Sequence, residues 1–330
     1  MIDKLKTALG QSKKILITTH KSPDGDAIGS SVAWYHFLKA QGKEALVVLP
    51  DEPADFLVPF LKDIDFLIYE KDAAKIDASL SNFDLLFCLD YNSPSRVGKN
   101  MELMLGNAKC SKVMIDHHQN PVEFCEIIIS RPEICSTAQL IYECIEELEA
   151  KDFLNKSSCE AIYLGIMTDT GSFRYPSVTS KTHLILAHLI EMGVEHFDIH
   201  EKIFDVNTLD KIQLRAYAIA NKFEKIPGFP IGLISMSSEE LQRFNYQKGD
   251  TEGLVNVILS IEGISIGLFL MESQDGVKMS FRSKGSYFVN DFAEKNFSGG
   301  GHKYAAGGFS SDSLNVTISR FKALVDELIQ

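Results

Sequence analysis

Short apolar runs that stop abruptly at polar residues shape the first 120 residues of the chain. These runs occupy residues 13–19, 45–49, 84–89 and 113–115. Their length and their polar boundaries predict buried β-strands. Residues 27–40, between the first two runs, carry apolar side chains at helical spacing and are followed by Gly42. A strand, a helix and a second strand in this order favour a parallel sheet, because parallel strands need such a crossover.

Helical periodicity replaces the strand pattern in the middle of the chain. Four segments show it, at residues 137–149, 158–167, 180–192 and 209–223. A dense turn signal with Pro227, Gly228 and Pro230 follows the last of these helices. Beyond this turn, alternating patterns predict strands, and a helical pattern closes the chain. The strands fall at residues 231–236, 264–271 and 277–281, and the helix at residues 316–329.

The order of these elements predicts an α/β chain of two domains. We expect a parallel-sheet N-terminal domain with flanking helices at residues 1–195 and a helical connector at residues 196–226. A smaller α+β C-terminal domain would follow at residues 227–330. Ligands bind at the carboxyl ends of the strands in such parallel sheets, so we expect the functional residues there.

Composition and charge narrow the function without changing the fold. The 330 residues are 45% hydrophobic and 24% charged, which is ordinary for a globular protein. The formal net charge of −12 argues against a broad grip on long nucleic acid, because such a grip depends on many basic contacts to phosphates. Residues 278–303 nevertheless hold five basic and two acidic side chains, so a small basic pocket is compatible with the acidic chain.

The cysteines and the apolar segments bear on where the protein works. No two of the six cysteines form a C-x-x-C pair, and most lie inside apolar strand or helix patterns. Reduced core thiols are therefore favoured over disulfides or a zinc site. The N-terminus lacks the apolar core of a signal peptide, and no run of 18 apolar residues occurs. We therefore expect a cytoplasmic protein with no membrane association.

Acidic and imidazole side chains follow three of the four N-terminal apolar runs. They are His20, Asp24 and Asp26 after the first run, Asp90 after the third, and Asp116, His117 and His118 after the fourth. Asp24 and Asp26 also suit the N-cap of the following helix, which is their main alternative role. Ionisable groups gathered at one sheet edge repel or desolvate one another without a cation. This recurrence therefore favours a site for manganese or a similar divalent ion.

Asp169 is a further candidate, because it ends an apolar helical pattern. A helix C-terminus disfavours a carboxylate, and a bound metal would remove this conflict. The alternative is a surface aspartate in a turn. Arg174, shortly after it, is a weaker candidate for substrate binding, since a solvated arginine explains it equally well.

A second group of candidates lies in the basic segment of the C-terminal domain. Arg282 offers a bidentate fork to a phosphate, and Ser283 offers a hydroxyl. The glycine cluster and its polar neighbours are Gly299, Gly300, Gly301, His302 and Lys303. Glycines let backbone N–H groups approach an anion, here before an expected short helix whose N-terminus favours negative charge. The alternative for a glycine run is a flexible linker.

Together these residues resemble the four motifs of the DHH phosphoesterase superfamily. The motifs correspond to His20/Asp24/Asp26, Asp90, Asp116/His117/His118 and Asp169. The run Phe281-Arg282-Ser283 and the glycine cluster, followed by Ala305-Ala306-Gly307-Gly308, resemble the DHH-associated C-terminal domain. The resemblance covers nearly the whole chain, with no departure at a motif position.

The resemblance implies a dinuclear metal site in the cleft between the two domains, usually with Mn²⁺ and alternatively with Mg²⁺ or Co²⁺. By carry-over, His20 and Asp24 would bind one ion, Asp26, His117 and Asp169 the other, and Asp90 would bridge them. His118 would face the phosphate, and Asp116 would orient an imidazole. Two metal ions would hold a hydroxide for attack on phosphorus, so no nucleophilic serine or cysteine is needed.

Within the superfamily, the nano-RNase and bisphosphate nucleotidase branch is the expected one. It implies hydrolysis of short RNA or DNA oligonucleotides, such as linear dinucleotides, to mononucleotides, and of 3′-phosphoadenosine 5′-phosphate to AMP. The compact length, without an extra strand-binding module, favours such short substrates. The family also implies a homodimer.

Four alternatives stay open beside this expectation. A RecJ-type single-strand exonuclease and a cyclic-dinucleotide phosphodiesterase share the enzyme class. A pyrophosphatase or polyphosphatase shares the N-terminal motifs but fits Arg282 and the glycine cluster less well. A non-catalytic nucleotide sensor would predict eroded metal ligands, whereas this sequence retains all of them.

Overall fold

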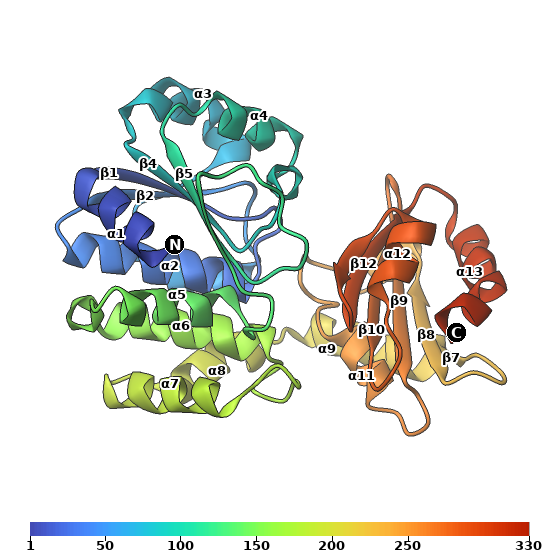
Figure 1. Cartoon of the computed structure of the whole chain (residues 1–330). Helices are drawn as coiled ribbons and strands as arrows, with labels where there is room; N and C mark the ends of the chain where they lie inside the picture. Colours follow the sequence, from blue (N-terminus) through green and yellow to red (C-terminus); the bar gives the residue numbers. More distant parts are fainter. Residues whose placement is uncertain (330) are drawn as a thin grey trace. The chain divides into compact units, whose positions relative to one another are not determined.

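The computed structural model describes residues 1–329, and the chain divides into two compact units, Met1–Val206 and Asn207–Gln330. Each unit is built on a six-stranded sheet of its own (Figure 1). The segment expected to connect the domains, residues 196–226, contains one helix of the first unit and one of the second.

The sheet of the first unit is entirely parallel, in the order β3-β2-β1-β4-β5-β6. Its strands are β1 (Lys14–Thr18), β2 (Glu44–Leu49), β3 (Phe66–Ile68), β4 (Leu85–Leu89), β5 (Ser111–Asp116) and β6 (Ile127–Ser130). The strand order reverses between β1 and β4, because the chain runs outward to β3 and then returns. In parallel α/β sheets, ligands bind outside the carboxyl ends of the strands at such a reversal.

Helices cover both faces of this sheet (Figure 1). On one face, α1, α2, α5 and α6 share a core with the strands, and α7 and α8 add side chains to the same core. The opposite face is covered by α3 and α4. The helices are α1 (Ile2–Gln11), α2 (Gly25–Ala40), α3 (Tyr69–Ser79), α4 (Lys99–Asn107), α5 (Thr137–Glu147), α6 (Lys156–Asp169), α7 (Ser180–Glu191) and α8 (His196–Phe204), with short 3-10 turns η1 (Asp55–Leu61), η2 (Leu80–Asn82), η3 (Pro94–Val97) and η4 (Lys151–Phe153).

Helix α2 is buried on almost every side, because it lies between the sheet and α5 and α6. Small residues make this close approach to α6 possible. A Cβ atom at Gly29 would lie 2.5 Å from the carbonyl oxygen of Ala161, and one at Gly165 would lie 2.7 Å from Oδ1 of Asp26. Because the two backbones are in such close contact, the N-terminal end of α2 is fixed near the carboxyl end of β1.

The second unit has a mixed sheet in the order β11-β12-β10-β9-β8-β7, in which only the β8–β9 pair is parallel. Side chains of α12 and α13 pack on one face, and those of α9, α10 and α11 pack on the other. The strands are β7 (Phe223–Lys225), β8 (Ile231–Met236), β9 (Ile266–Ser273), β10 (Gly276–Ser283), β11 (Gly300–His302) and β12 (Ala305–Ser310); the helices are α9 (Leu209–Lys222), α10 (Ser238–Arg243), α11 (Leu254–Leu259), α12 (Asn290–Phe297) and α13 (Leu314–Ala323), followed by η5 (Val325–Leu328).

The predicted fold class is confirmed: a parallel-sheet N-terminal part with flanking helices precedes a smaller part with its own sheet. One local expectation is wrong. The glycine cluster does not precede a short helix, because Gly300–His302 forms strand β11 and pairs with β12. The hairpin requires glycine at position 299, since a Cβ atom there would lie 2.1 Å from the carbonyl oxygen of Gly307.

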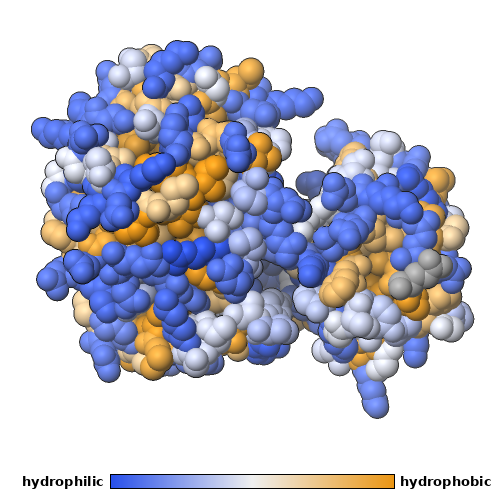
Figure 2. All heavy atoms as spheres, in the orientation of Figure 1, coloured by the Kyte–Doolittle hydropathy of each residue, from blue (hydrophilic) through white to orange (hydrophobic). Residues whose placement is uncertain are grey.

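On the face that Figure 2 shows, both hydrophilic and hydrophobic residues lie at the surface of each unit. Among residues 1–329, no helix combines the length and the apolar character that crossing a membrane requires.

Candidate metal centre

His20 and Asp24 lie on the loop between β1 and α2. His20 is buried, and its Nδ1 atom is 2.9 Å from the carbonyl oxygen of Lys21. Because a carbonyl only accepts, Nδ1 donates this hydrogen bond and Nε2 faces the site. This Nε2 atom lies 3.8 Å from Oδ1 of Asp24. Asp24 also caps α2 by accepting the N–H groups of Asp26 and Ala27, so the capping role and the proximity to His20 coexist.

Asp26, in the first turn of α2, is held by the backbone of another helix. Its Oδ2 accepts the N–H of Thr137 at 2.7 Å, and its Oδ1 accepts the N–H of Ala138 at 2.9 Å. These two residues begin α5, and the N-terminus of a helix favours a negative charge. Asp26 is therefore fixed in orientation, with Oδ2 also 3.8 Å from Nε2 of His117.

Asp90 occupies the centre of the cluster, directly after β4. Its Oδ2 is 3.4 Å from Nε2 of His20, and its Oδ1 is 3.7 Å from Nε2 of His117. Oδ1 also accepts the hydroxyl of Thr137 at 2.7 Å. The backbone of Asp90 has a φ of 65°, a left-handed conformation that aspartate adopts more readily than most residues. This turn places the carboxylate between the two imidazoles.

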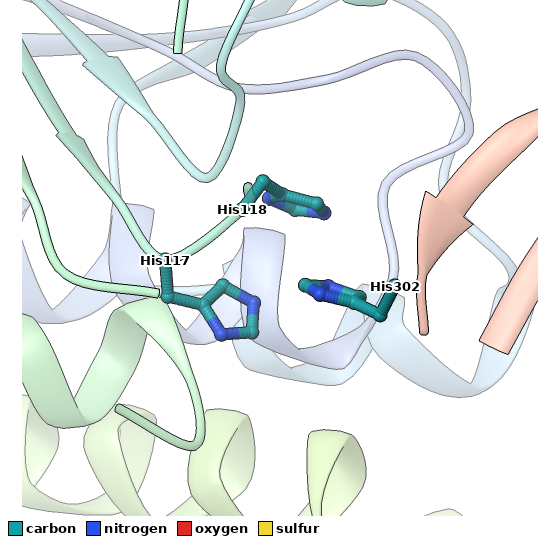
Figure 3. A group of neighbouring side chains, drawn as sticks. All are labelled: His117, His118 and His302. Carbon is teal, nitrogen blue, oxygen red and sulfur yellow. The ribbon is translucent and has the colours of Figure 1, made fainter. Parts of the chain in front are cut away.

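The two histidines after β5, drawn in Figure 3, have different hydrogen-bond partners. Nδ1 of His117 is 3.1 Å from the carbonyl oxygen of Ile134, so Nε2 remains available to the cluster. Nδ1 of His118 instead donates to Oδ1 of the fully buried Asp116 at 2.8 Å. Asp116 therefore orients His118, and the backbone orients His117. Figure 3 also labels His302, which lies on β11 of the second unit.

Asp169, the last residue of α6, joins the cluster through His117. Its Oδ2 lies 3.5 Å from Nε2 of His117, and a third of its side chain is exposed. Asp169 is thus a partly exposed member of the first unit's cluster. A surface aspartate in a turn, the alternative considered from the sequence, would not have this contact with a buried histidine.

Burial and mutual repulsion perturb the ionisation of these groups. Burial, with the neighbouring charges of Asp90 and Asp169, raises the pKa of Asp26 well above its ordinary value. Burial also raises the pKa of Asp169 to about 6, although His117 opposes the shift. Burial alone would lower the pKa of His20, but Asp24 and Asp90 outweigh it and raise the pKa to about 10. The cluster therefore takes up protons to offset its excess negative charge when no cation is bound.

Three groups of candidate donor atoms share the carboxylate of Asp90, and two of these groups consist only of expected metal ligands. His20, Asp24 and Asp90 form the first, and Asp26, Asp90 and His117 form the second. Within each group the ligand atoms lie within 4.8 Å of one another. Mixed carboxylate and imidazole donors suit manganese and similar first-row ions, and a divalent cation would relieve the repulsion described above. The residues present therefore fit a divalent metal ion.

Two residues beside the cluster carry no clear sequence signal. Thr137 binds Asp90 through its hydroxyl and Asp26 through its N–H, although it lies 47 and 111 residues away along the chain. Arg96, on η3, places Nη2 3.3 Å from Nε2 of His118. An arginine only donates, so Nε2 of His118 accepts and the ring is neutral in this contact.

The candidate substrate residues of the second unit form a row across its sheet. Arg282 on β10 pairs with Ala305 on β12, and Ala305 pairs with His302 on β11. Directly opposed residues of antiparallel strands share a sheet face, so the small Ala305 separates two long polar side chains. Nη1 of Arg282 donates to the carbonyl oxygen of Phe281 at 2.9 Å.

The remaining candidates differ in how accessible their polar groups are. Ser283 is buried, and its hydroxyl donates to the carbonyl oxygen of Tyr287 at 2.8 Å. Lys303 is exposed at the turn between β11 and β12. Gly301 has a φ of 144°, a conformation that favours glycine, so the hairpin also requires glycine at this position. Arg174 is exposed in the first unit, and its Nε donates to the carbonyl oxygen of Gly171 within its own turn.

Comparisons with known proteins agree with this arrangement. The DHH family, N-terminal domain, matches residues 14–166, and the DHHA1 domain matches residues 232–330. The bifunctional oligoribonuclease and PAP phosphatase NrnA of Thermus thermophilus is 31% identical over 89% of this chain and 83% of its own length. The Bacillus subtilis protein of the same name is 26% identical over 95% of each chain.

A solved structure shows the same fold over nearly the full length. The crystal structure of an exopolyphosphatase-related protein from Bacteroides fragilis has a TM-score of 0.94 and 35% sequence identity, covering 99% of this chain and 95% of that one. The fold and the carboxylate–imidazole cluster define a phosphoric ester hydrolase. The chain belongs to the DHH family, in its form with a C-terminal DHHA1 domain.

Proposed function

We propose that this chain is a Mn²⁺-dependent phosphoesterase that hydrolyses short oligonucleotides to mononucleotides and 3′-phosphoadenosine 5′-phosphate to AMP. The observation that carries the proposal is the sharing of Asp90 by two groups of candidate ligands. A shared carboxylate between two ligand groups is what a pair of neighbouring cations needs. The names of the relatives support the choice of substrate, since both are oligoribonucleases and PAP phosphatases.

Each proposed metal ligand has a defined contact in the first unit. The first ion would be held by His20 and Asp24, the second by Asp26, His117 and Asp169, and Asp90 would serve both. Two divalent ions in such a site supply Lewis-acid activation of water and neutralise charge that develops on the phosphate. His20 and His117 present Nε2 because a backbone carbonyl holds each Nδ1 proton. This second contact fixes the ring orientation, as for most metal-binding histidines.

His118 has the role of contacting the substrate phosphate in this proposal. Asp116 holds the His118 ring by accepting the Nδ1 proton, so the ring direction is set before substrate arrives. Nε2 of His118 accepts from Arg96 in the substrate-free protein.

The second unit would contribute the residues that select a nucleotide. Arg282 and His302 share one sheet face, with the small Ala305 between them. A guanidinium and an imidazole on one sheet face suit a phosphate group, which arginine binds through two parallel hydrogen bonds. Arg282 is thus the proposed phosphate-binding residue, and Lys303 adds positive charge nearby.

One substrate panel tests the proposal. Purified protein with Mn²⁺ is incubated with labelled dinucleotides, longer single strands and 3′-phosphoadenosine 5′-phosphate. We expect mononucleotides from the dinucleotides and AMP from the bisphosphate. Asp90→Asn serves as the inactive variant, and Asp152→Asn, at an exposed position on η4, serves as its active control. Activity on long strands without release of mononucleotides from dinucleotides would favour the exonuclease alternative instead.

A homodimer is part of the same proposal. Helices α7 and α8 expose apolar side chains, with Leu184 71% and Phe197 63% exposed. Exposed apolar surface of this kind supports association with a second copy. Light scattering coupled to size-exclusion chromatography tests it, and a monomeric mass at micromolar concentration would contradict it.

A further inference from the structure

Two exposed aromatic rings lie beside the glycine cluster of the second unit. Phe288, on the loop between β10 and α12, is 46% exposed, and Tyr304, on the turn between β11 and β12, is 40% exposed. Their ring centroids are 5.6 Å apart at an interplanar angle of 61°. Nζ of Lys303 lies 5.3 Å from the centroid of Phe288. Two rings and a cation therefore form one surface feature, the Phe288–Tyr304 pair.

Hydrogen bonds hold this pair in place. The hydroxyl of Tyr304 donates to the carbonyl oxygen of Gly285 at 3.1 Å. The N–H of Val289 donates to the carbonyl oxygen of Lys303 at 2.8 Å. The loop that carries Phe288 is thus tied at two points to the turn that carries Tyr304. Rings held in this way lose little conformational freedom when a flat ligand contacts them.

The pair adjoins the proposed phosphate-binding row. Tyr304 directly precedes Ala305, which pairs with Arg282. The carbonyl oxygen of Tyr304 also accepts the N–H of Ser283 at 3.0 Å, and Ser283 follows Arg282. The aromatic pair, a lysine and an arginine therefore lie within a few residues of one another at one end of the sheet. This combination is typical of surfaces that bind single-stranded nucleic acid, in which basic groups contact phosphates and rings stack on bases.

We propose that the Phe288–Tyr304 pair is a stacking site for a nucleobase of the substrate. The site rests on the proposed function, because it assigns a place to one base of an oligonucleotide whose phosphate contacts Arg282. Stacking accepts any base, so the pair would favour nucleotides over inorganic phosphate esters without reading the sequence. Loss of one base–aromatic contact weakens binding by about 5- to 150-fold.

The experiment compares the Phe288→Ala and Tyr304→Ala variants with the unaltered full chain. The substrates are a 5′-phosphorylated dinucleotide and two analogues, each with one base replaced by an abasic residue. We expect KM for the dinucleotide to rise by about 5- to 150-fold while kcat changes little. For the analogue that lacks the stacked base, the variants and the unaltered chain should have equal KM. A variant effect that persists on both analogues would show that the rings only support the loop, and would overturn the proposal.

Two controls separate structural damage from loss of stacking. Phe153→Ala removes a ring that is 41% exposed in the first unit and should leave KM unchanged. Tyr304→Phe keeps the ring but loses the hydroxyl bond to Gly285, so its KM should stay much closer to that of the unaltered chain. Thermal unfolding of every variant checks folding.

A binding measurement separates this proposal from the proposed function. Quenching of a dinucleotide that contains 2-aminopurine reports stacking without turnover. Quenching that is lost in Phe288→Ala supports the stacking site even if no dinucleotide is cleaved, which would contradict the proposed function alone. Turnover with equal KM and equal quenching in all variants would overturn the stacking site alone.

Discussion

Gly165 on α6 offers a test of how tightly the metal site depends on helix packing. A Cβ atom at this position would lie 2.4 Å from Cβ of Ala138 and 2.7 Å from Oδ1 of Asp26. Carbon atoms in optimal contact are about 3.5–4.0 Å apart, so Gly165→Ala forces α5 or Asp26 to move by about 1 Å. That movement separates Asp26 from the N–H groups of Thr137 and Ala138, which now orient it.

Gly165→Ala should change two quantities, the free energy of unfolding and the affinity for Mn²⁺. Overpacking destabilises by about 1–3 kcal/mol, and replacing a helical glycine with alanine returns about 0.5–1 kcal/mol, so a net loss of up to about 2.5 kcal/mol is expected. Disturbing the residues that orient a metal ligand lowers affinity by about 10- to 100-fold. The stabilisation that saturating Mn²⁺ gives should then shrink by about 1.4–2.8 kcal/mol.

Chemical denaturation with and without Mn²⁺ measures the free energy of unfolding, and titration calorimetry measures the affinity for Mn²⁺. Gly106→Ala on α4 is the matched control, because a Cβ atom there meets nothing within 4 Å. Adding Ala138→Gly to Gly165→Ala removes one of the two overlaps and should recover stability more than metal affinity. Unchanged Mn²⁺ affinity in a folded Gly165→Ala protein would refute the reasoning that packing against Gly165 positions Asp26.

Four further outcomes are expected. Asp90→Asn keeps the left-handed backbone but removes the shared charge. Turnover should therefore be lost, and calorimetry should show fewer bound ions. Turnover at the original rate would contradict the shared role of Asp90. Arg282→Ala should raise KM more than it lowers kcat in steady-state assays, whereas a fall in kcat alone would place Arg282 in the transition state. Arg96→Lys keeps the charge but loses the planar fork that contacts His118, so kcat/KM for dinucleotides should fall about 10-fold, and an unchanged value would show that this contact does not affect turnover. His20, with a pKa of about 10, is protonated in the metal-free protein at neutral pH and must lose this proton to bind a metal. Mn²⁺ affinity should therefore rise with pH, and calorimetric heats should depend on the ionisation enthalpy of the buffer; equal heats in all buffers would argue against proton release.

The strand ends could be predicted from the sequence because a strong periodic signal marks them. An apolar run ending in Asp116 indicates a buried strand and its carboxyl end, and β5 ends at this residue. The edge strands β3 and β6 were not predicted, since strands of three or four residues give little periodicity. The strand β11 was also missed, because glycines have low strand propensity and only pairing with β12 explains it.

The partners of individual side chains could not be predicted from spacing. Which histidine Asp116 orients depends on the direction of the backbone after β5, and the structure pairs it with His118. The two N–H groups that bind Asp26 come from a helix more than 100 residues later. Arg96 lies on a short 3-10 turn, whose conformation leaves no periodic signal.

The distribution of functional residues along the chain has an evolutionary consequence. All six candidate metal ligands lie within Met1–Val206, whereas Arg282 and the Phe288–Tyr304 pair lie after Asn207. On the proposed roles, recombination near the junction of the two units would therefore exchange the substrate-binding residues together. All six candidate metal ligands would stay in place. A lineage built in this way can acquire new phosphoester substrates without passing through forms that have lost their metal site.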